Sequence, residues 1–444
     1  METEVWSLAM FGLVVLCLLL GYPVAFTLGA VALLFGGVFL GLDFFNLLPL
    51  RIWGIMTNFT LLAVPLFVYM GVILEKSGIA EELLETMGLL FGRVRGGLAV
   101  SIVIVGAMLA ATTGVVGATV VTMTVIALPA MLKHGYRTQL ATGTIAASGT
   151  LGQIIPPSIV LILLGDVIGV PVGQLFIAAV TPGILLIGLF IIYILYIAWR
   201  QPQVAPAVDQ QSLAGQAQRS LSGRIVGSLL PPLLLVIAVL GSIFFGIASP
   251  TESAAIGALG AMVLAALRRQ LTLSHVRVAT LQTMRMTSMV FLILIGATAF
   301  GLVFRGMGGD MLVEDLLTNL PGGEWGFLVF SMVLIFVLGF FLDFIEICFI
   351  VVPILAPIAD SLGIDLLWFA VLIAMNLQTS FLTPPFGFSL FYLKAAAPAE
   401  IRLAEIYHGI IPFVLIQVLT LAVLIGMPDV TLWLPHIMDS LQGF

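Results

Sequence analysis

Two pairs of consecutive prolines, Pro156-Pro157 and Pro384-Pro385, interrupt sequence that is otherwise apolar. Consecutive prolines remove two backbone donors and force the preceding residue into an extended conformation, so a helix breaks and its carbonyl oxygens lose their partners. Hydroxyl side chains stand beside both pairs, at Ser158 and Thr383. Carbonyl and hydroxyl oxygens suit a small cation, and the half-helix after each pair favours an anionic group at its N-terminus. The chemistry indicated is joint binding of a cation and an anionic solute.

Two acidic residues, Asp343 and Glu346, lie within another apolar stretch. A carboxylate at membrane depth is costly unless it is paired, hydrated or functional. We therefore expect Asp343 to belong to a polar network beside the second proline pair. The sequence contains no enzyme motif, so we predict no catalytic residue and no organic cofactor.

The chain that positions these residues must cross a membrane many times. Of its 444 residues, 61% are hydrophobic and 9% are charged, whereas roughly a quarter are charged in a globular protein. The net charge of −6 is spread over loops, which argues against a nucleic-acid partner. We predict an all-α integral membrane protein with about 10–12 spans in the lipid bilayer. Long apolar runs occur at 5–20, 22–41, 60–77, 172–199, 225–248, 251–267, 287–304 and 406–428.

An internal repeat relates the two proline pairs. The corresponding residues are separated by 228 positions: Pro129 and Pro357, Gly135 and Gly363, and the two pairs themselves. An amphipathic segment precedes each set, around 81–84 and around 314–317. An ordered set of matches indicates duplication. It also favours function over the packing role that a single proline often has in a membrane helix.

Charges predict that the two copies are inverted. By the positive-inside rule, a basic copy enters the membrane from the cytoplasm and an acidic copy from outside. We accordingly expect Met1 to lie outside. The first copy carries Lys76, Arg93, Arg95, Lys133 and Arg137, and the second carries Asp310, Glu314, Asp315 and Glu324 with only Arg305.

Each copy contains a segment that is too long for one helix and too short for two spans. The stretch between Gly96 and Ala130 is interrupted by Thr112-Thr113-Gly114, and the matching stretch turns between Gly339 and Asp343. A re-entrant hairpin fits both segments, and its tip must face protein, water or a ligand. We expect two hairpins and two broken helices to form one site.

The polar, proline-containing stretch 201–224 is typical of a linker between the two halves. The full organisation that we predict is a set of scaffold helices at 1–59; a first inverted repeat at 60–200, with its hairpin at about 96–130 and its broken helix at about 138–168; a cytoplasmic linker at 201–224; scaffold helices at 225–286; a second inverted repeat at 287–398, with its hairpin at about 325–357 and its broken helix at about 366–393; and a C-terminal helix and tail at 399–444.

Three motifs carry a family resemblance: Ile154-Ile155-Pro156-Pro157-Ser158, Pro250-Thr251-Glu252, and Thr383-Pro384-Pro385-Phe386-Gly387 after Gly339-Phe340-Phe341-Leu342-Asp343. With them the chain resembles, over nearly its whole length, the large (M, DctM-like) subunit of tripartite ATP-independent periplasmic (TRAP) transporters. The resemblance implies a multi-pass protein of the bacterial inner membrane that works as an elevator. It also implies sodium-driven uptake of a small organic anion, a four-helix membrane (Q, DctQ-like) subunit and a periplasmic substrate-binding (P) protein.

The resemblance also implies site residues. One sodium ion is expected near Thr113, Gly152, Ile155 and Pro156, and a second near Gly339, Ser380, Thr383 and Phe386. The neighbouring candidates for substrate binding are Thr112, Gly114, Pro157, Ser158, Asp343, Pro385 and Gly387. Val115 and Val116 stand where small hydroxyl residues are usual in the family, and Ser380 stands where Gly is usual, so the hydroxyl ligand of the first ion is open.

Two other functions stay open. A stand-alone sodium:anion symporter of the same elevator superfamily would share the hairpins and broken helices but would need no binding protein. A non-transporting membrane scaffold would use the hairpins for packing, and its paired prolines would be dispensable.

Overall fold

A computed structural model describes residues 2–113, 116–208, 225–385 and 387–442, and the regular structure in these ranges is helical. Within them, seven helices are long and apolar enough to cross a membrane alone, or eight if the pair Leu42–Met56 and Thr60–Lys76, bent by 54°, counts as one span. Shorter apolar helices complete the bundle. The prediction of an all-α, multi-span fold is confirmed.

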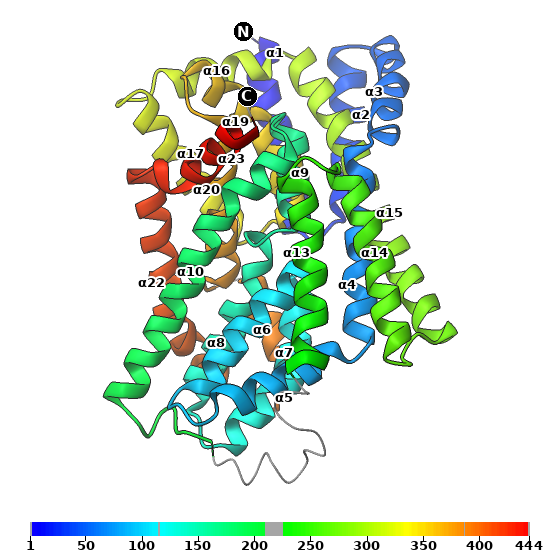
Figure 1. Cartoon of the computed structure of the whole chain (residues 1–444). Helices are drawn as coiled ribbons and strands as arrows, with labels where there is room; N and C mark the ends of the chain where they lie inside the picture. Colours follow the sequence, from blue (N-terminus) through cyan, green and yellow to red (C-terminus); the bar gives the residue numbers. More distant parts are fainter. Residues whose placement is uncertain (1, 114–115, 209–224, 386, 443–444) are drawn as a thin grey trace.

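The first half starts with helices that surround the site and ends its opening section with an amphipathic helix, α5. In α5, Ile79, Leu83 and Met87 are buried at four-residue spacing, whereas Glu81 and Glu82 are exposed, as expected for a helix with one apolar face. It lies across the lower end of the molecule in Figure 1. The bounds are α1 (Glu2–Leu19), α2 (Val24–Phe39), η1 (Leu42–Leu47), α3 (Leu48–Met56), η2 (Thr60–Leu62), α4 (Ala63–Lys76) and α5 (Ile79–Phe91).

A pair of helices and a broken helix follow. α6 and α7 pack against each other and against α8. α8 ends just before the first proline pair, because proline cannot continue a helical hydrogen-bond ladder, and α9 resumes beyond it. The bounds are α6 (Gly97–Thr113), α7 (Val116–Lys133), α8 (Thr138–Thr150), η3 (Leu151–Gln153), α9 (Ile159–Ile168) and α10 (Val172–Arg200).

The second half repeats this plan. α14 begins with a capping box, in which Ser249 Oγ accepts a hydrogen bond from the Glu252 backbone at 3.3 Å and Glu252 Oε2 accepts one from the Ser249 backbone at 2.7 Å. The bounds are η4 (Ile225–Leu229), α13 (Leu230–Phe244), α14 (Pro250–Leu267), α15 (Leu273–Gly306), α16 (Gly309–Thr318), α17 (Glu324–Leu338), α18 (Phe344–Glu346), η5 (Ile347–Val351), α19 (Val352–Ser361), α20 (Leu366–Leu382), α21 (Phe388–Ala396), α22 (Leu403–Gly426) and α23 (Asp429–Gln442).

The two halves are inverted with respect to each other and interlock. α6 and α7 enter from the lower end of the bundle, whereas α17 and α19 enter from the upper end (Figure 1). α7 packs against α21, the second part of the other half's broken helix, and α19 packs in the same way against α9. α20 also contacts η3 at the first break. The four elements that carry the predicted site therefore form one packed unit.

Charge distinguishes the two ends of the bundle. α4 ends at Lys76, α10 ends at Arg200 and Arg268 follows α14, all towards the lower end. α16, with Asp310 and Glu314, lies at the upper end together with both termini (Figure 1). The positive-inside rule assigns the lower end to the cytoplasm. We call the lower end inner and the upper end outer; Met1, which the sequence predicts to lie outside, is not among the described residues.

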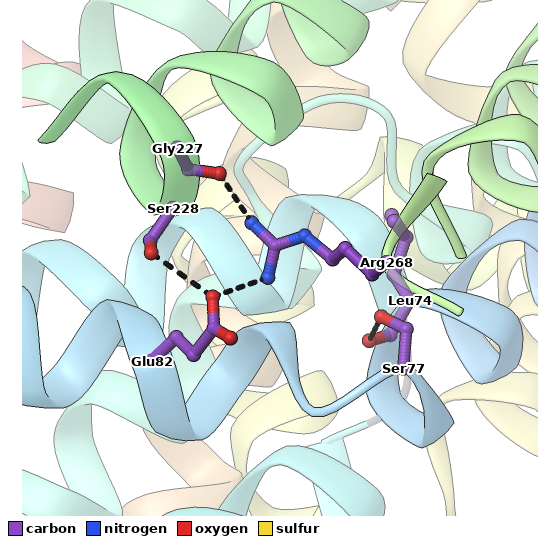
Figure 2. A network of polar contacts seen from close by, with 6 residues as sticks. All are labelled: Leu74, Ser77, Glu82, Gly227, Ser228 and Arg268. Atoms are coloured by element: carbon purple, nitrogen blue, oxygen red, sulfur yellow. Dashed lines mark hydrogen bonds and ion pairs between the residues drawn. The ribbon is translucent and has the colours of Figure 1, made fainter. Parts of the chain in front are cut away.

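A polar network at the inner end joins three segments that are far apart in the sequence (Figure 2). Arg268 forms an ion pair with Glu82 of α5 at 2.6 Å and donates to the Gly227 carbonyl at 2.6 Å. Ser228 donates to the same Glu82 carboxylate at 2.9 Å. Exposed pairs of this kind contribute only about 0–1 kcal/mol, so the network mainly fixes where α5 lies against η4 and the end of α14.

A glycine crossing holds the broken helix α8 against α22. A Cβ atom on Gly143 would come within 2.6 Å of the carbonyl carbon of Gly409 and would overlap its oxygen. A Cβ on Gly409 would meet the backbone of Gln139 at 3.0 Å. Backbones approach this closely only where both residues lack side chains.

Candidate functional site

The first break is a short, buried piece of irregular backbone. η3 tightens the end of α8, the chain bends through Ile155, Pro156 and Pro157, and α9 starts at Ile159 after the extended Ser158. Gly152, Pro156 and Pro157 are buried, and Ile155 is half-buried. In both breaks the proline–proline peptide bond is cis.

A serine beyond each proline pair reaches back to a carbonyl of the helix before it. Ser158 Oγ donates to the Gln153 carbonyl at 3.1 Å, and Ser389 Oγ donates to the Phe381 carbonyl at 2.9 Å. Gln153 and Phe381 are repeat partners, 228 positions apart. Sequence reasoning found Ser158 but missed Ser389, which lies outside the motif and acts only because the backbone folds back.

The hydroxyl groups at the second break are arranged as acceptors. Ser380 Oγ donates to the Leu377 carbonyl at 2.9 Å and Thr383 Oγ1 donates to the Thr379 carbonyl at 2.7 Å. A hydroxyl group has one proton and two lone pairs. Because each proton is directed to a backbone oxygen, the lone pairs of Ser380 and Thr383 remain available to a cation.

The structure brings the predicted residues Gly339 and Ser380 into contact. A Cβ atom on Gly339 would come within 2.8 Å of the Ser380 Cβ and would overlap its hydroxyl group. The first half has a related contact, where a Cβ on Gly152 would lie 3.1 Å from the Ala110 Cβ of α6. Each break therefore packs directly on a hairpin arm. Gly114 and Phe386, and the side chains of Thr112 and Thr113, lie outside the described residues.

Asp343 caps the second arm of the second hairpin. Its Oδ1 accepts a hydrogen bond from the Phe344 backbone at 2.7 Å, and Glu346 Oε2 accepts one from the Asp343 backbone at 3.1 Å. The two acids thus form a capping box. The polar network expected for Asp343 consists, within the described residues, of this local pair.

The backbone beyond the second proline pair is tightly folded. A Cβ on Gly387 would lie 2.8 Å from the Phe381 carbonyl oxygen and 3.0 Å from that of Thr383, so glycine alone fits without a shift. The Pro385 carbonyl accepts a hydrogen bond from the Tyr407 hydroxyl at 3.2 Å. One of its lone pairs is therefore already in use.

Two glutamines that sequence reasoning passed over lie close to the breaks along the chain. Gln153 in η3 and Gln378 in α20 are fully buried, and neither the nitrogen nor the oxygen of either side-chain amide has a partner in the described part of the chain. Leaving such a group without a partner costs about 1–3 kcal/mol. The sequence could have indicated these two glutamines, because a side-chain amide within a membrane segment is rare and tends to mark function.

Comparison with known proteins identifies the family. The family model "Tripartite ATP-independent periplasmic transporter, DctM component" matches residues 11–430. The chain belongs to this family. The C4-dicarboxylate TRAP transporter large permease protein DctM of Pseudomonas aeruginosa is 31% identical over 392 residues, which cover 88% of this chain and 89% of that protein. The ectoine TRAP transporter large permease protein TeaC of Halomonas elongata is 29% identical, with 97% and 98% covered.

The fold has a solved counterpart outside this family model. The YdaH transporter of Alcanivorax borkumensis superimposes with a TM-score of 0.63, at 15% identity, over 96% of this chain and 98% of that one. At this identity the likeness concerns the fold alone. The family match confirms the resemblance seen in the sequence: this DctM-family chain is a multi-pass membrane permease of a bacterial TRAP system, and it is a transporter and not an enzyme.

Proposed function

We propose that this DctM-family permease moves a small organic acid into the cell, driven by sodium, and that the two interlocked breaks are where ion and solute bind. The observation that carries the proposal is the paired arrangement of hydroxyl and carbonyl oxygens at two inverted, buried breaks. A packing kink explains one break, but it does not explain matched oxygen groups at both.

We assign one sodium site to the break in each inverted repeat. Oxygen ligands suit a small hard cation. The hydroxyl groups of Ser380 and Thr383 donate their protons to backbone carbonyls, so their lone pairs can bind a cation. Many of the other ligands would be backbone carbonyls. The residues proposed for the first ion are Thr113, Gly152, Ile155 and Pro156, and those for the second are Gly339, Ser380, Thr383 and Phe386.

The solute is assigned to the space between the two breaks. α9 and α21 both begin there, and the unpaired N–H groups of a helix start favour a carboxylate. The relatives' names differ in substrate, C4-dicarboxylate in one and ectoine in the other, so family membership leaves the individual acid open. The proposed contact residues are Thr112, Gly114, Pro157, Ser158, Asp343, Pro385 and Gly387.

An elevator movement would carry this packed unit past the outer helices. The proposed mobile part consists of the hairpins at about 96–130 and 325–357 and the broken helices at about 138–168 and 366–393. The helices at 1–59 and 225–286 would form the scaffold. The other parts of the tripartite system, a small Q subunit and a periplasmic P protein that delivers the solute, complete the proposal.

Transport in liposomes tests the proposal directly. The permease, reconstituted with its Q and P partners, is expected to accumulate the labelled ligand of the P protein only under an inward sodium gradient. An equal potassium gradient is the control. Uptake that ignores sodium would reject the coupling, and full uptake without the P protein would favour a stand-alone symporter instead.

Replacing Thr383 by alanine should weaken sodium dependence more than folding. The change removes one oxygen ligand, whereas the proline pair still maintains the break, so we expect the sodium concentration for half-maximal uptake to rise about tenfold. Thr280→Ala is the matched control, since Thr280 makes the same kind of bond to the Val276 carbonyl, at 2.8 Å, on an exposed face of α15. A large loss of thermal stability with unchanged sodium dependence would reassign Thr383 to packing.

A further inference from the structure

A cavity of about 880 Å³ opens at the outer end between two groups of helices. One wall comes from α3, α15 and α16, and the other from the end of α9 and from η5 and α19. The second wall therefore belongs to the unit that carries the two breaks. The cavity lies on the side from which a solute would arrive, outside the cation site described above.

The cavity gathers the basic side chains of the outer end. Among the described residues, Arg51 on α3 and Arg305 on α15 are the only lysine or arginine residues in the outer half, and both line this cavity. The other described lysines and arginines lie on segments of the inner half. Because the positive-inside rule disfavours arginine at the outer end, two arginines around one cavity call for a specific role.

Neither arginine is neutralised by the chain itself. Within the described residues, Arg51 and Arg305 form no ion pair and no hydrogen bond, although Asp310 and Glu314 line the same cavity. The third acid of the lining, Asp166, is held by Asn58 Nδ2 at 2.6 Å.

Guanidinium groups without a partner are suited to carboxylates. The planar fork of arginine matches a carboxylate in two parallel hydrogen bonds. Low-dielectric walls strengthen the field inside a cleft and raise the local concentration of the matching ion. Most of the cavity's lining residues are apolar, and the side chains of Arg51 and Arg305 are exposed to solvent, so both guanidinium groups are accessible to an arriving anion.

We propose that this cavity is an outer vestibule in which the carboxylate of the arriving solute binds between Arg51 and Arg305 before it reaches the breaks. The inference rests on the proposed function for the identity of the solute. Three acids of the lining, Asp166, Asp310 and Glu314, would repel the same carboxylate, so its binding depends on both arginines. Loss of either one should reverse the preference of the cavity from anions to cations.

The test uses charged thiol reagents and needs no known substrate. In a chain with Cys17→Ala and Cys348→Ala, a single cysteine is introduced by Thr298→Cys, within the cavity lining, or by Asn319→Cys, on the exposed outer surface. Each is labelled with a sulfonate-bearing and with a trimethylammonium-bearing methanethiosulfonate. We expect the anionic-to-cationic rate ratio to be about tenfold higher at Thr298→Cys.

Further variants locate the effect. Adding Arg51→Gln or Arg305→Gln to Thr298→Cys should abolish the higher anionic-to-cationic rate ratio. Arg51→Lys keeps the positive charge and should keep the higher ratio. Arg277→Gln, in the inner half of α15, should not change the ratio. The proposal would be overturned if the anionic-to-cationic rate ratio were equal at the two positions or did not depend on either arginine. It would also be overturned if Thr298→Cys were not labelled. Labelling requires neither sodium nor transport, so this outcome is independent of the sodium-uptake test.

Discussion

A Gly339→Ala permease should fold and yet lose sodium-driven uptake by a factor of roughly ten or more. The added methyl group would overlap the Ser380 hydroxyl, with the Ser380 Cβ only 2.8 Å away. The hydroxyl is one of the proposed ion ligands, so pushing it aside changes the site, while the surrounding helices keep their packing. Uptake in liposomes and thermal stability are measured on the same preparation.

The decisive comparison is a double variant. Ser380→Gly removes the atoms that the new methyl group would meet, so adding Gly339→Ala to Ser380→Gly should cause little loss of uptake beyond that of Ser380→Gly alone. The pair would then resemble the first half, where Ala110 on the hairpin arm faces Gly152 at the break. Gly188→Ala in α10, where a Cβ meets no atom within 4 Å, is the control. If Gly339→Ala lowered uptake as much in the Ser380→Gly background as in the unchanged chain, contact between the two residues would not be the cause.

Replacing Gly143 by alanine should cost about 3 kcal/mol of stability, because overpacking here presses backbone against backbone. The atoms that a Cβ would meet belong to the main chain of Gly409 on α22, and no side-chain rotation can relieve the overlap. We expect a fall in melting temperature, and a loss of folded protein in size-exclusion chromatography.

Two further variants give this expectation its controls. Gly409→Ala should act in the same direction, since its Cβ would meet the Gln139 backbone across the same crossing. Gly188→Ala has open space and should leave stability unchanged or slightly raised, because alanine is the better helix former. A Gly143→Ala chain as stable as Gly188→Ala would show that the two helices can separate at no cost.

The features that sequence predicted are those that follow from local chemistry. Helices α8 and α20 end before the paired prolines because two consecutive prolines remove two backbone donors, whereas single prolines such as Pro182 lie inside helices. The inversion of the halves could be predicted because the charge of each loop separately indicates the side of the membrane on which it lies. The capping role of Asp343 was also within reach, since Asp343 and Glu346 have the spacing of a capping box, but the cost of an acid in the membrane suggested a wider network.

The features that sequence could not predict depend on tertiary approach. The contact between Gly143 and Gly409 joins helices from opposite halves, and neither residue differs by type from the chain's other glycines. The bond from Ser389 to the Phe381 carbonyl exists only because the chain turns back at Gly387. The vestibule depends on Arg51 and Arg305, which lie on separate helices and line the same cavity. They are far apart in the sequence, so the sequence does not indicate that they share a cavity.

The Glu82–Arg268 network determines where the chain would have to bend. It ties α5 to η4 and to the end of α14 at the cytoplasmic surface, while α6 begins only a few residues after α5 ends, at Gly97. If the first hairpin travels and α5 stays, the displacement must be absorbed between them, by large backbone rotations over few residues. That connection contains Gly92 and Gly96, and Gly96 already has a positive φ of 78°. In the proposed elevator movement, the turn before α6 would therefore be the hinge.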